Sequence, residues 1–277
     1  MISNVSIIGM AFSGAIAVLL PIILAIVFYR FHRYRISFLF VGAAAFFFSQ
    51  IILRSMLLSQ LVKTSFHESM AENLLYVFVI GALSAGLFEE SARYFGFSRL
   101  KQRGPTWADA VAFGIGHGGI ESIVLVGISQ VSNIFMAFMI RSGMFDSTIA
   151  PSLGDQADAF KAQYLETAPS LFFASGLERI AVMPVHIFLS VLVCLAVIKK
   201  RPILLLVSIL LHALVNTPAV ISQLYEINVW IIEAIIILIG VAMLVGTIRL
   251  KSSFPSTVPA REPGGDTRDD PAFASKE

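Results

Sequence analysis

Two adjacent carboxylates and an arginine, Glu89, Glu90 and Arg93, lie inside an otherwise apolar stretch of the chain. On a helix, Glu89 and Arg93 share a face at a spacing of four residues, and Glu90 reaches Arg93 at three. Ionisable groups at bilayer depth are costly, so they face a protein interior or a water-filled cavity. One ion pair suffices for a structural clamp between helices. The second carboxylate therefore favours a functional site.

Three histidines in separate apolar segments, His117, His186 and His212, lie near the depth of Glu89. With a rise of 1.5 Å per residue, all four fall roughly 13–18 Å from the membrane boundary that is marked by basic segments. Unrelated structural histidines are not expected to share one level. We therefore expect Glu89, His117 and His212 to converge on one cavity, and we expect that cavity to open toward the cytoplasmic half.

Two of these histidines have a polar partner one helical turn away, which predicts hydrolytic chemistry. His117 shares a face with Glu121, among glycines that permit close helix approach. His212 has the same spacing to Asn216. A carboxylate beside a histidine can deprotonate a water for attack on an amide carbonyl. A histidine and an asparagine can donate hydrogen bonds to the developing oxyanion.

The remaining buried charges are more easily explained by structure. Arg179 and His186 lie seven residues apart on one helical stripe, and Glu178 precedes them. Arg54 lies at about the depth of Glu178, so the two could pair. For Arg54, Glu178 and Arg179 we favour structural ion pairing. For His186 and for Glu121 the two interpretations stay equally open.

The elements that must position these residues are membrane helices. The chain has 277 residues, of which 57% are hydrophobic and 14% charged, and its mean hydropathy is +0.82. Apolar runs of about twenty residues recur along it, which is typical of an all-α, multi-pass integral membrane protein. The lone cysteine, Cys194, excludes an intrachain disulfide and a cysteine metal cage. No basic region precedes the first apolar run, which predicts an uncleaved first helix.

Seven transmembrane helices are expected in a single domain, residues 1–250. Their predicted ranges are 5–29, 37–62, 73–98, 107–140, 170–198, 203–222 and 228–248. The fourth is too long for one straight span, so it tilts, kinks or re-enters. The composition of residues 63–72 predicts a polar loop, and that of residues 146–166 predicts a mildly acidic loop. Residues 251–277, rich in Pro, Gly, Ser and Asp, predict a disordered tail.

The basic residues set the expected orientation. Clusters at 30–35, 99–103, 199–201 and 249–251 fall on alternate connections, all on one side of a seven-helix bundle. The positive-inside rule then predicts an exterior N-terminus, a cytoplasmic C-terminus and an exterior segment at 142–168.

Three short motifs resemble those of the CAAX-protease and bacteriocin-processing (CPBP) superfamily. They are Glu89-Glu90-x-x-Arg93, Phe113-x-x-x-His117 and His212-x-x-x-Asn216. The fuller pattern, with Glu121 and with Glu178-Arg179 leading to His186, resembles its YhfC branch of intramembrane peptidases. The resemblance covers a catalytic core at about 40–222. The superfamily's usual first motif has three residues between the second Glu and the Arg, and this chain has two.

The resemblance implies an intramembrane endopeptidase of a bacterial plasma membrane. Glu89 with His117 would activate the water, and His212 with Asn216 would form the oxyanion hole. Supporting roles would fall to Glu90, Arg93, Glu121, His186, Glu178, Arg179 and Arg54. The favoured mechanism is of glutamic type and needs no cofactor.

Other interpretations stay open. A zinc site could use His117, His212 or His186 with Glu90 or Glu121, although no HExxH motif is present. Members of this branch are often described as metalloproteases, and the residues do not exclude that. A proton-coupled transporter or an idle scaffold would be a different class. Expected partners are the lipid bilayer and a membrane protein or peptide substrate, not nucleic acid. The sequence leaves the oligomeric state open.

Overall fold

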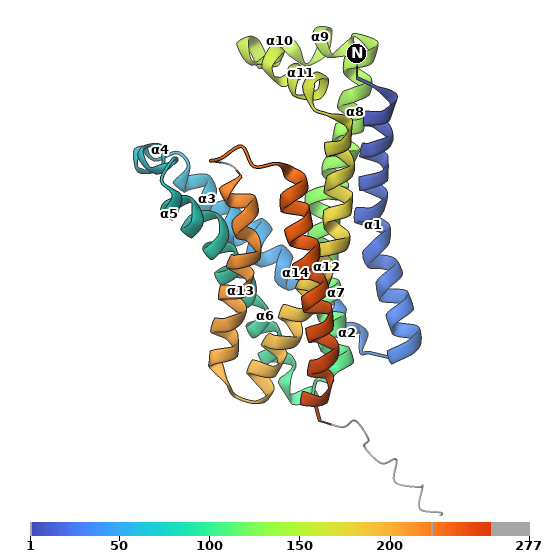
Figure 1. Cartoon of the computed structure of the whole chain (residues 1–277), viewed down its shortest axis with the longest axis vertical. Coiled ribbons are helices and arrows are strands. Elements are labelled where there is room, and N and C mark those ends of the chain that lie inside the picture. The colour runs from blue at the N-terminus through green and yellow to red at the C-terminus, as the bar shows by residue number, and fades with distance from the viewer. Residues whose placement is uncertain (1, 223, 256–277) are drawn as a thin grey trace, which may run out of the picture.

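The computed structural model describes residues 2–222 and 224–255, and their regular structure is entirely helical. Seven helices in this part of the chain are long and apolar enough to cross a membrane, which confirms the predicted all-α, seven-span bundle. Figure 1 shows them side by side, with the connections at two opposite ends. The spans are Asn4–His32, Ile36–Leu61, Leu74–Arg103, Trp107–Ser142, Pro169–Ile198, Pro202–Ile221 and Val229–Ser253.

Three of the spans contain a stretch of π-helix. The second is built from α2 (Ile36–Phe46), η1 (Phe47–Arg54) and α3 (Ser55–Leu61). The third is built from α5 (Leu74–Val77), η2 (Phe78–Leu83), α6 (Ser84–Leu100) and η3 (Lys101–Arg103). The fourth is built from α7 (Trp107–Glu121), η4 (Ser122–Gly127) and α8 (Ile128–Ser142). Such bulges widen a helix locally and are frequent at functional sites.

The other spans are α1 (Asn4–His32), α12 (Pro169–Ile198), α13 (Pro202–Ile221) and α14 (Val229–Arg249), which continues into η6 (Leu250–Ser253). Capping residues and prolines define where these helices begin. Ser3 caps α1, and Pro169 and Pro202 occupy first helical positions, where a missing N–H is harmless. Thr106 and Asp109 form a capping box at the start of α7.

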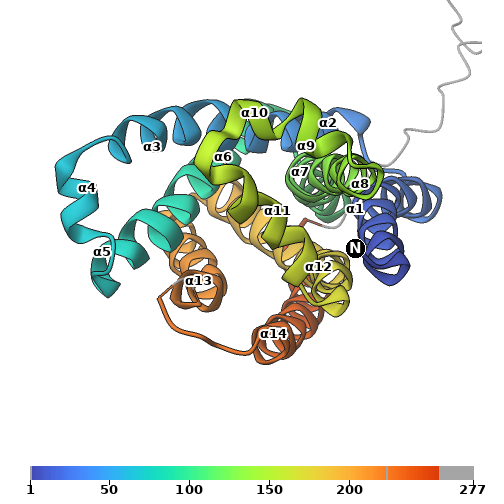
Figure 2. The ribbon, with the colours of Figure 1, turned by 90° about the horizontal axis from the view of Figure 1, so that it is seen from above.

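The α12 helix lies at the centre of the bundle. In the most apolar 18-residue stretch of α12, 78% of the residues are buried, compared with 17–33% in the corresponding stretches of the other six spans. It packs against α1, α6, α7, α13 and α14, as the view along the bundle suggests (Figure 2). Ligands for a site can therefore come from several helices that surround α12.

Two predicted loops contain helices. Residues 65–70 form α4 (Ser65–Met70). The segment expected to be an acidic loop at 146–166 folds into α9 (Met144–Thr148), α10 (Ala150–Leu153), η5 (Gly154–Gln156) and α11 (Ala157–Glu166). We call α9 to α11 the cap; Figure 1 shows it at the end of the bundle where the chain starts. Phe145 packs the cap onto a cluster that includes Met10, Ala137 and Ile140, and this burial explains why the segment is helical.

The remaining differences concern the fourth span and the tail. The fourth span does not re-enter: it runs as one helix through η4, and α8 extends to the cap. At the other end, the predicted tail begins as the short helix η6, and Phe254 is buried in the main apolar cluster. The rest of the predicted tail, 256–277, lies outside the described residues.

Two glycines bring α2 and α7 into direct backbone contact. A Cβ atom added at Gly116 would lie 1.9 Å from the carbonyl oxygen of Leu39. One added at Gly42 would lie 2.1 Å from the carbonyl oxygen of Phe113. Only glycine allows such an approach. The contact sets the position of α7, and with it His117.

Candidate active site

Glu89 lies at the meeting point of three helices. Its side chain projects from α6 and is 6% exposed. One carboxylate oxygen, Oε2, lies 3.0 Å from Nε2 of His117 on α7. The other, Oε1, lies 3.6 Å from Nε2 of His212 on α13. Both histidines expected to take part in the chemistry thus lie close to the Glu89 carboxylate.

Glu90 points to the other side of α6 and has no solvent exposure. Its carboxylate accepts hydrogen bonds from Arg93 Nη1, from Ser208 Oγ at 2.9 Å, and pairs with His212 Nδ1 at 2.6 Å. Because an ionised carboxylate only accepts, His212 Nδ1 is the donor and its Nε2 is directed to Glu89. Glu90 therefore orients a histidine and does not face the cavity.

His186 on α12 is held between an arginine and a carboxylate. Its Nδ1 lies 2.8 Å from Arg93 Nη2. Arginine can only donate, so Nδ1 accepts and the proton of the neutral ring is on Nε2. That nitrogen lies 2.9 Å from Glu121 Oε2, although the angle is not that of a hydrogen bond. His186 and Glu121 are thus part of the same constellation as Glu89.

Arg179 joins two carboxylates at the edge of this cluster. Its guanidinium donates to Glu121 Oε1 at 2.9 Å and to Glu178. The expectation of structural ion pairing therefore fits Glu178 and Arg179. The expected pair between Arg54 and Glu178 is absent from the described residues. Arg54 instead donates hydrogen bonds to the Gln50 side chain on its own span and to the Ser84 hydroxyl and two backbone carbonyls on the third span.

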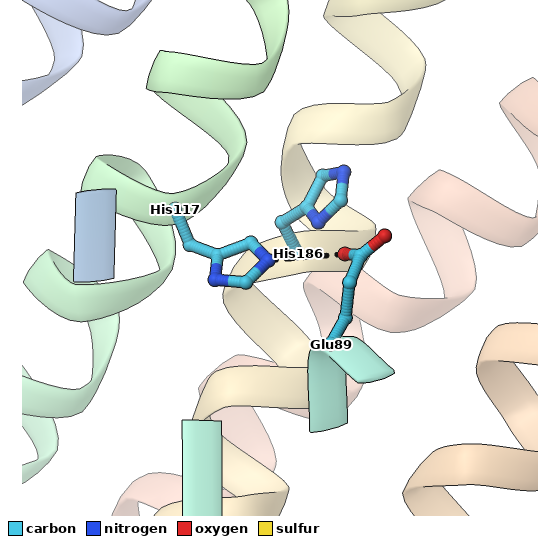
Figure 3. A group of neighbouring side chains, drawn as sticks. All are labelled: Glu89, His117 and His186. Atoms are coloured by element: carbon cyan, nitrogen blue, oxygen red, sulfur yellow. Dashed lines mark hydrogen bonds and ion pairs between the residues drawn. The ribbon is translucent and has the colours of Figure 1, made fainter. Parts of the chain in front are cut away.

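Glu89, His117 and His186 form a group that could hold a metal ion. Each offers one ligand atom, and these atoms lie within 4.8 Å of one another (Figure 3). All three residues are buried, and His117 Nδ1 has no hydrogen-bond partner among the described residues. Two histidines and a carboxylate are a common ligand set of catalytic zinc. The carboxylate in this group is Glu89, not Glu90 or Glu121 as expected for a metal site.

A cavity of about 370 Å³ leads to Glu89. Its walls come from η1 and α3, from η2 and α6, and from the last turns of α13; they include Arg54, Leu58, Asn216 and Val220. Leu58 and Val220 lie near those ends of α3 and α13 that are opposite the basic segments. The cavity therefore occupies the half of the bundle away from the basic segments. The expectation that it opens toward their side is wrong.

A smaller cavity of about 80 Å³ continues behind the first. Both are lined by Glu89, Glu121 and Asn216, and the smaller one also by His186 and His212. Asn216 follows His212 by one turn on α13. Its position between the two cavities is compatible with binding a group beside Glu89.

Three polar residues of this region escaped the sequence analysis. Ser208 precedes His212 by four residues and Gln50 precedes Arg54 by four, so the one-turn spacing that paired His212 with Asn216 would have found both. Glu233 is the acidic residue within the apolar stretch 229–248, is 7% exposed, and its Oε2 has no hydrogen-bond partner among the described residues.

Seven apolar helices around a buried cluster of histidines and carboxylates define a polytopic membrane protein with an intramembrane polar site. Residues 16–237 match the family described as YhfC intramembrane metalloprotease. The chain belongs to this family. It is 40% identical over 227 residues to a Bacillus subtilis (strain 168) protein named uncharacterized membrane protein YhfC, and the match covers 80% of this chain and 87% of that protein. No solved structure matches the chain.

Proposed function

We propose that this protein is a zinc-dependent endopeptidase that cleaves a membrane protein or membrane-associated peptide. The main support is the convergence of Glu89, His117 and His186 from three helices within 4.8 Å, in a chain whose family is described as an intramembrane metalloprotease. The family description runs against the glutamic mechanism favoured by sequence. We therefore make the metal the leading hypothesis.

The residues fit such a cation. His117 Nε2 already lies 3.0 Å from Glu89 Oε2, and the three residues offer ligand atoms within 4.8 Å of one another. The chemistry that zinc supplies in a three-ligand site is activation of water at neutral pH and polarisation of a carbonyl. Arg93 Nη2 lies 2.8 Å from His186 Nδ1 and 3.7 Å from Glu89 Oε2. If His186 bound through Nδ1, Arg93 would give up that hydrogen bond.

The neighbouring side chains supply the remaining roles. Glu121 lines both cavities outside the ligand group, and it accepts the proton of the attacking water. His212 donates from Nδ1 to Glu90, so in its doubly protonated form its Nε2 donates a hydrogen bond to the oxygen of the scissile carbonyl, together with the side-chain amide of Asn216. Arg179 holds Glu121 in place. The substrate reaches these groups through the 370 Å³ cavity.

A glutamic mechanism is the second candidate, and one contact favours it. His117 Nε2 lies 3.0 Å from Glu89 Oε2, which is the pair needed for a histidine-assisted carboxylate base. In that mechanism Glu89 would itself take the proton of the water. The two candidates share His212 and Asn216 and differ in the need for metal.

Metal analysis of purified variants separates the two candidates. We expect about one zinc per wild-type chain, and loss of zinc in Glu89→Gln, His117→Ala and His186→Ala because each removes a ligand. Asn216→Ala should retain zinc and lose about 10²–10³-fold in cleavage of a quenched fluorescent Leu/Ala-rich membrane peptide. A zinc-free wild type with cleavage that resists chelators would overturn the metal mechanism and support the glutamic one.

A further inference from the structure

Arg54 is a charged residue of the cavity that the proposed mechanism does not use. It is the last residue of η1, is half-buried, and is the one cation among the residues that line the 370 Å³ cavity. Within residues 2–222 and 224–255, no carboxylate lies within ion-pair distance of it. An uncompensated charge in an apolar bundle is costly and marks a functional position.

The carboxylates deeper in the cavity do not need this charge. Glu89 has Arg93 within 3.7 Å and two histidines beside it. Glu121 has a direct ion pair with Arg179 at 2.9 Å. Each acid therefore has an arginine closer to it than Arg54, and no carboxylate of the described residues lies within ion-pair distance of the guanidinium at the cavity wall.

The guanidinium of Arg54 is held rigidly. Nε donates to Ser84 Oγ at 3.0 Å, and Nη2 donates to the carbonyl oxygens of Ile80 at 2.9 Å and Gly81 at 3.0 Å. Nη1 donates to Gln50 Oε1 at 3.2 Å. These bonds use four of its five N–H donors and leave one on Nη1. All four acceptors are neutral, so they fix the plane of the group without balancing its charge.

We propose that Arg54 binds a carboxylate of the substrate, and so selects polypeptides with an acidic group close to the scissile bond on its cap side. This inference rests on the proposed function, because it takes the occupant of the cavity to be a polypeptide. Arginine is suited to carboxylates through charge-assisted hydrogen bonds in a site with little water. Arg54 and Glu89 line one cavity, and Arg54 lies nearer its cap end, so the group it binds belongs to a chain that continues to the catalytic residues.

Peptide binding tests the assignment without cleavage. The probes are fluorescent Leu/Ala-rich membrane peptides of one sequence with a free C-terminal carboxylate, with an amidated C-terminus, or amidated with one internal Asp. Binding is measured to the detergent-purified Glu89→Gln protein, so that hydrolysis plays no part. We expect a carboxylated probe to bind roughly 10–100-fold more tightly than the neutral amide, as for a hydrogen bond to a charged group. The probe that shows the gain tells whether the α-carboxylate or an acidic side chain is bound.

Substitutions separate recognition of the probe's charge by Arg54 from the role of the hydrogen bonds that hold its guanidinium in place. In the Glu89→Gln protein, a second substitution Arg54→Gln should abolish the preference for carboxylated probes. Arg54→Lys, which keeps the positive charge, should retain part of that preference. Ser84→Ala removes one brace and keeps the charge, so it should keep the preference. Arg141→Gln, which removes an exposed cation that bonds to Asn4, is the matched control and should change nothing. Equal binding of all probes to the Glu89→Gln protein with Arg54 intact would overturn the proposal. So would a preference that survives Arg54→Gln, or an equal loss for charged and neutral probes. Because binding is the readout, a failed protease assay would leave this result standing.

Discussion

Glu89 and Glu90 are adjacent carboxylates with opposite surroundings. Glu89 lines both cavities and lies within 3.0–3.6 Å of two histidines. Glu90 is fully buried, and its two oxygens are taken up by Arg93, Ser208 and His212. The difference follows from the partners of Glu90, because Arg93 on α6 and the two α13 residues occupy its carboxylate, whereas Glu89 lines the cavities. At the residue scale, Glu90 is a positioning group for His212.

Glu90→Gln should lower stability more than it lowers metal content. The substitution removes the closer of the two carboxylates beside the buried guanidinium of Arg93 and leaves only Glu89 at 3.7 Å, and breaking a buried pair in this way costs up to about 3–5 kcal/mol. Thermal unfolding of the purified protein should show a lower midpoint, with bound zinc unchanged before unfolding because Glu90 is not in the ligand group. The matched control is Glu178→Gln, whose side chain is 31% exposed and also pairs with an arginine. A larger drop for Glu178→Gln than for Glu90→Gln would contradict this assignment.

Contacts between whole helices place the ligands. The α7 helix carries His117, and its approach to α2 depends on Gly116 and Gly42. On the other side, η1, η2 and η4 each contribute to the wall of the larger cavity through Gln50, Gly81 and Leu125. Three π-helical segments thus face one cavity. Their irregular backbones widen the helices where the substrate would lie.

Gly116→Ala should move α7 away from α2 and displace the neighbouring His117. The added methyl would lie 1.9 Å from the Leu39 carbonyl oxygen, so the helices must separate. We expect a stability loss of about 1–3 kcal/mol, typical of overpacking, together with reduced zinc content and activity. Unfolding midpoints and metal analysis measure both. In Gly14→Ala, the control, the nearest atom is 3.3 Å away, so little should change. Normal zinc binding by Gly116→Ala would show that the contact does not position the ligand.

The molecule as a whole has two chemically different ends. Basic residues collect at one end, whereas the cap and the mouth of the larger cavity lie at the other. If the basic end is cytoplasmic, as the positive-inside rule predicts, the site is reached from the exterior half of the membrane. Substrates would then be membrane proteins with a segment exposed on that side.

Single cysteines test this orientation in intact cells. Cys194 is fully buried, so Cys194→Ser supplies the background. A membrane-impermeant maleimide should label Asp158→Cys, in the exposed face of the cap, because the cap is predicted to be exterior. Lys101→Cys, exposed in η3, should be labelled only after the membrane is opened. The reverse pattern would place the cap and the mouth of the cavity in the cytoplasm.

The amino-acid sequence alone predicts the helical bundle and points to most residues of the candidate site. Apolar runs specify spans whatever their neighbours are, because every backbone group in lipid must be satisfied within a helix. The rarity of charge at membrane depth singled out Glu89, His117 and His212. Depth and spacing favoured Glu89 over Glu90 as the catalytic carboxylate, but they did not show which helix lies beside each of these adjacent residues.

The geometry of the candidate site follows from tertiary packing. In the folded chain His186 lies beside Glu89 and His117, and Arg54 bonds to Ser84 and not to Glu178. The segment predicted to be an acidic loop is helical. Tertiary packing also places the cavity in the half away from the basic segments. Depth along a helix follows from counting residues at a fixed rise. Rotation about the helix axis and the space left between helices depend on packing contacts such as Gly116 with Leu39, which join residues far apart in the chain.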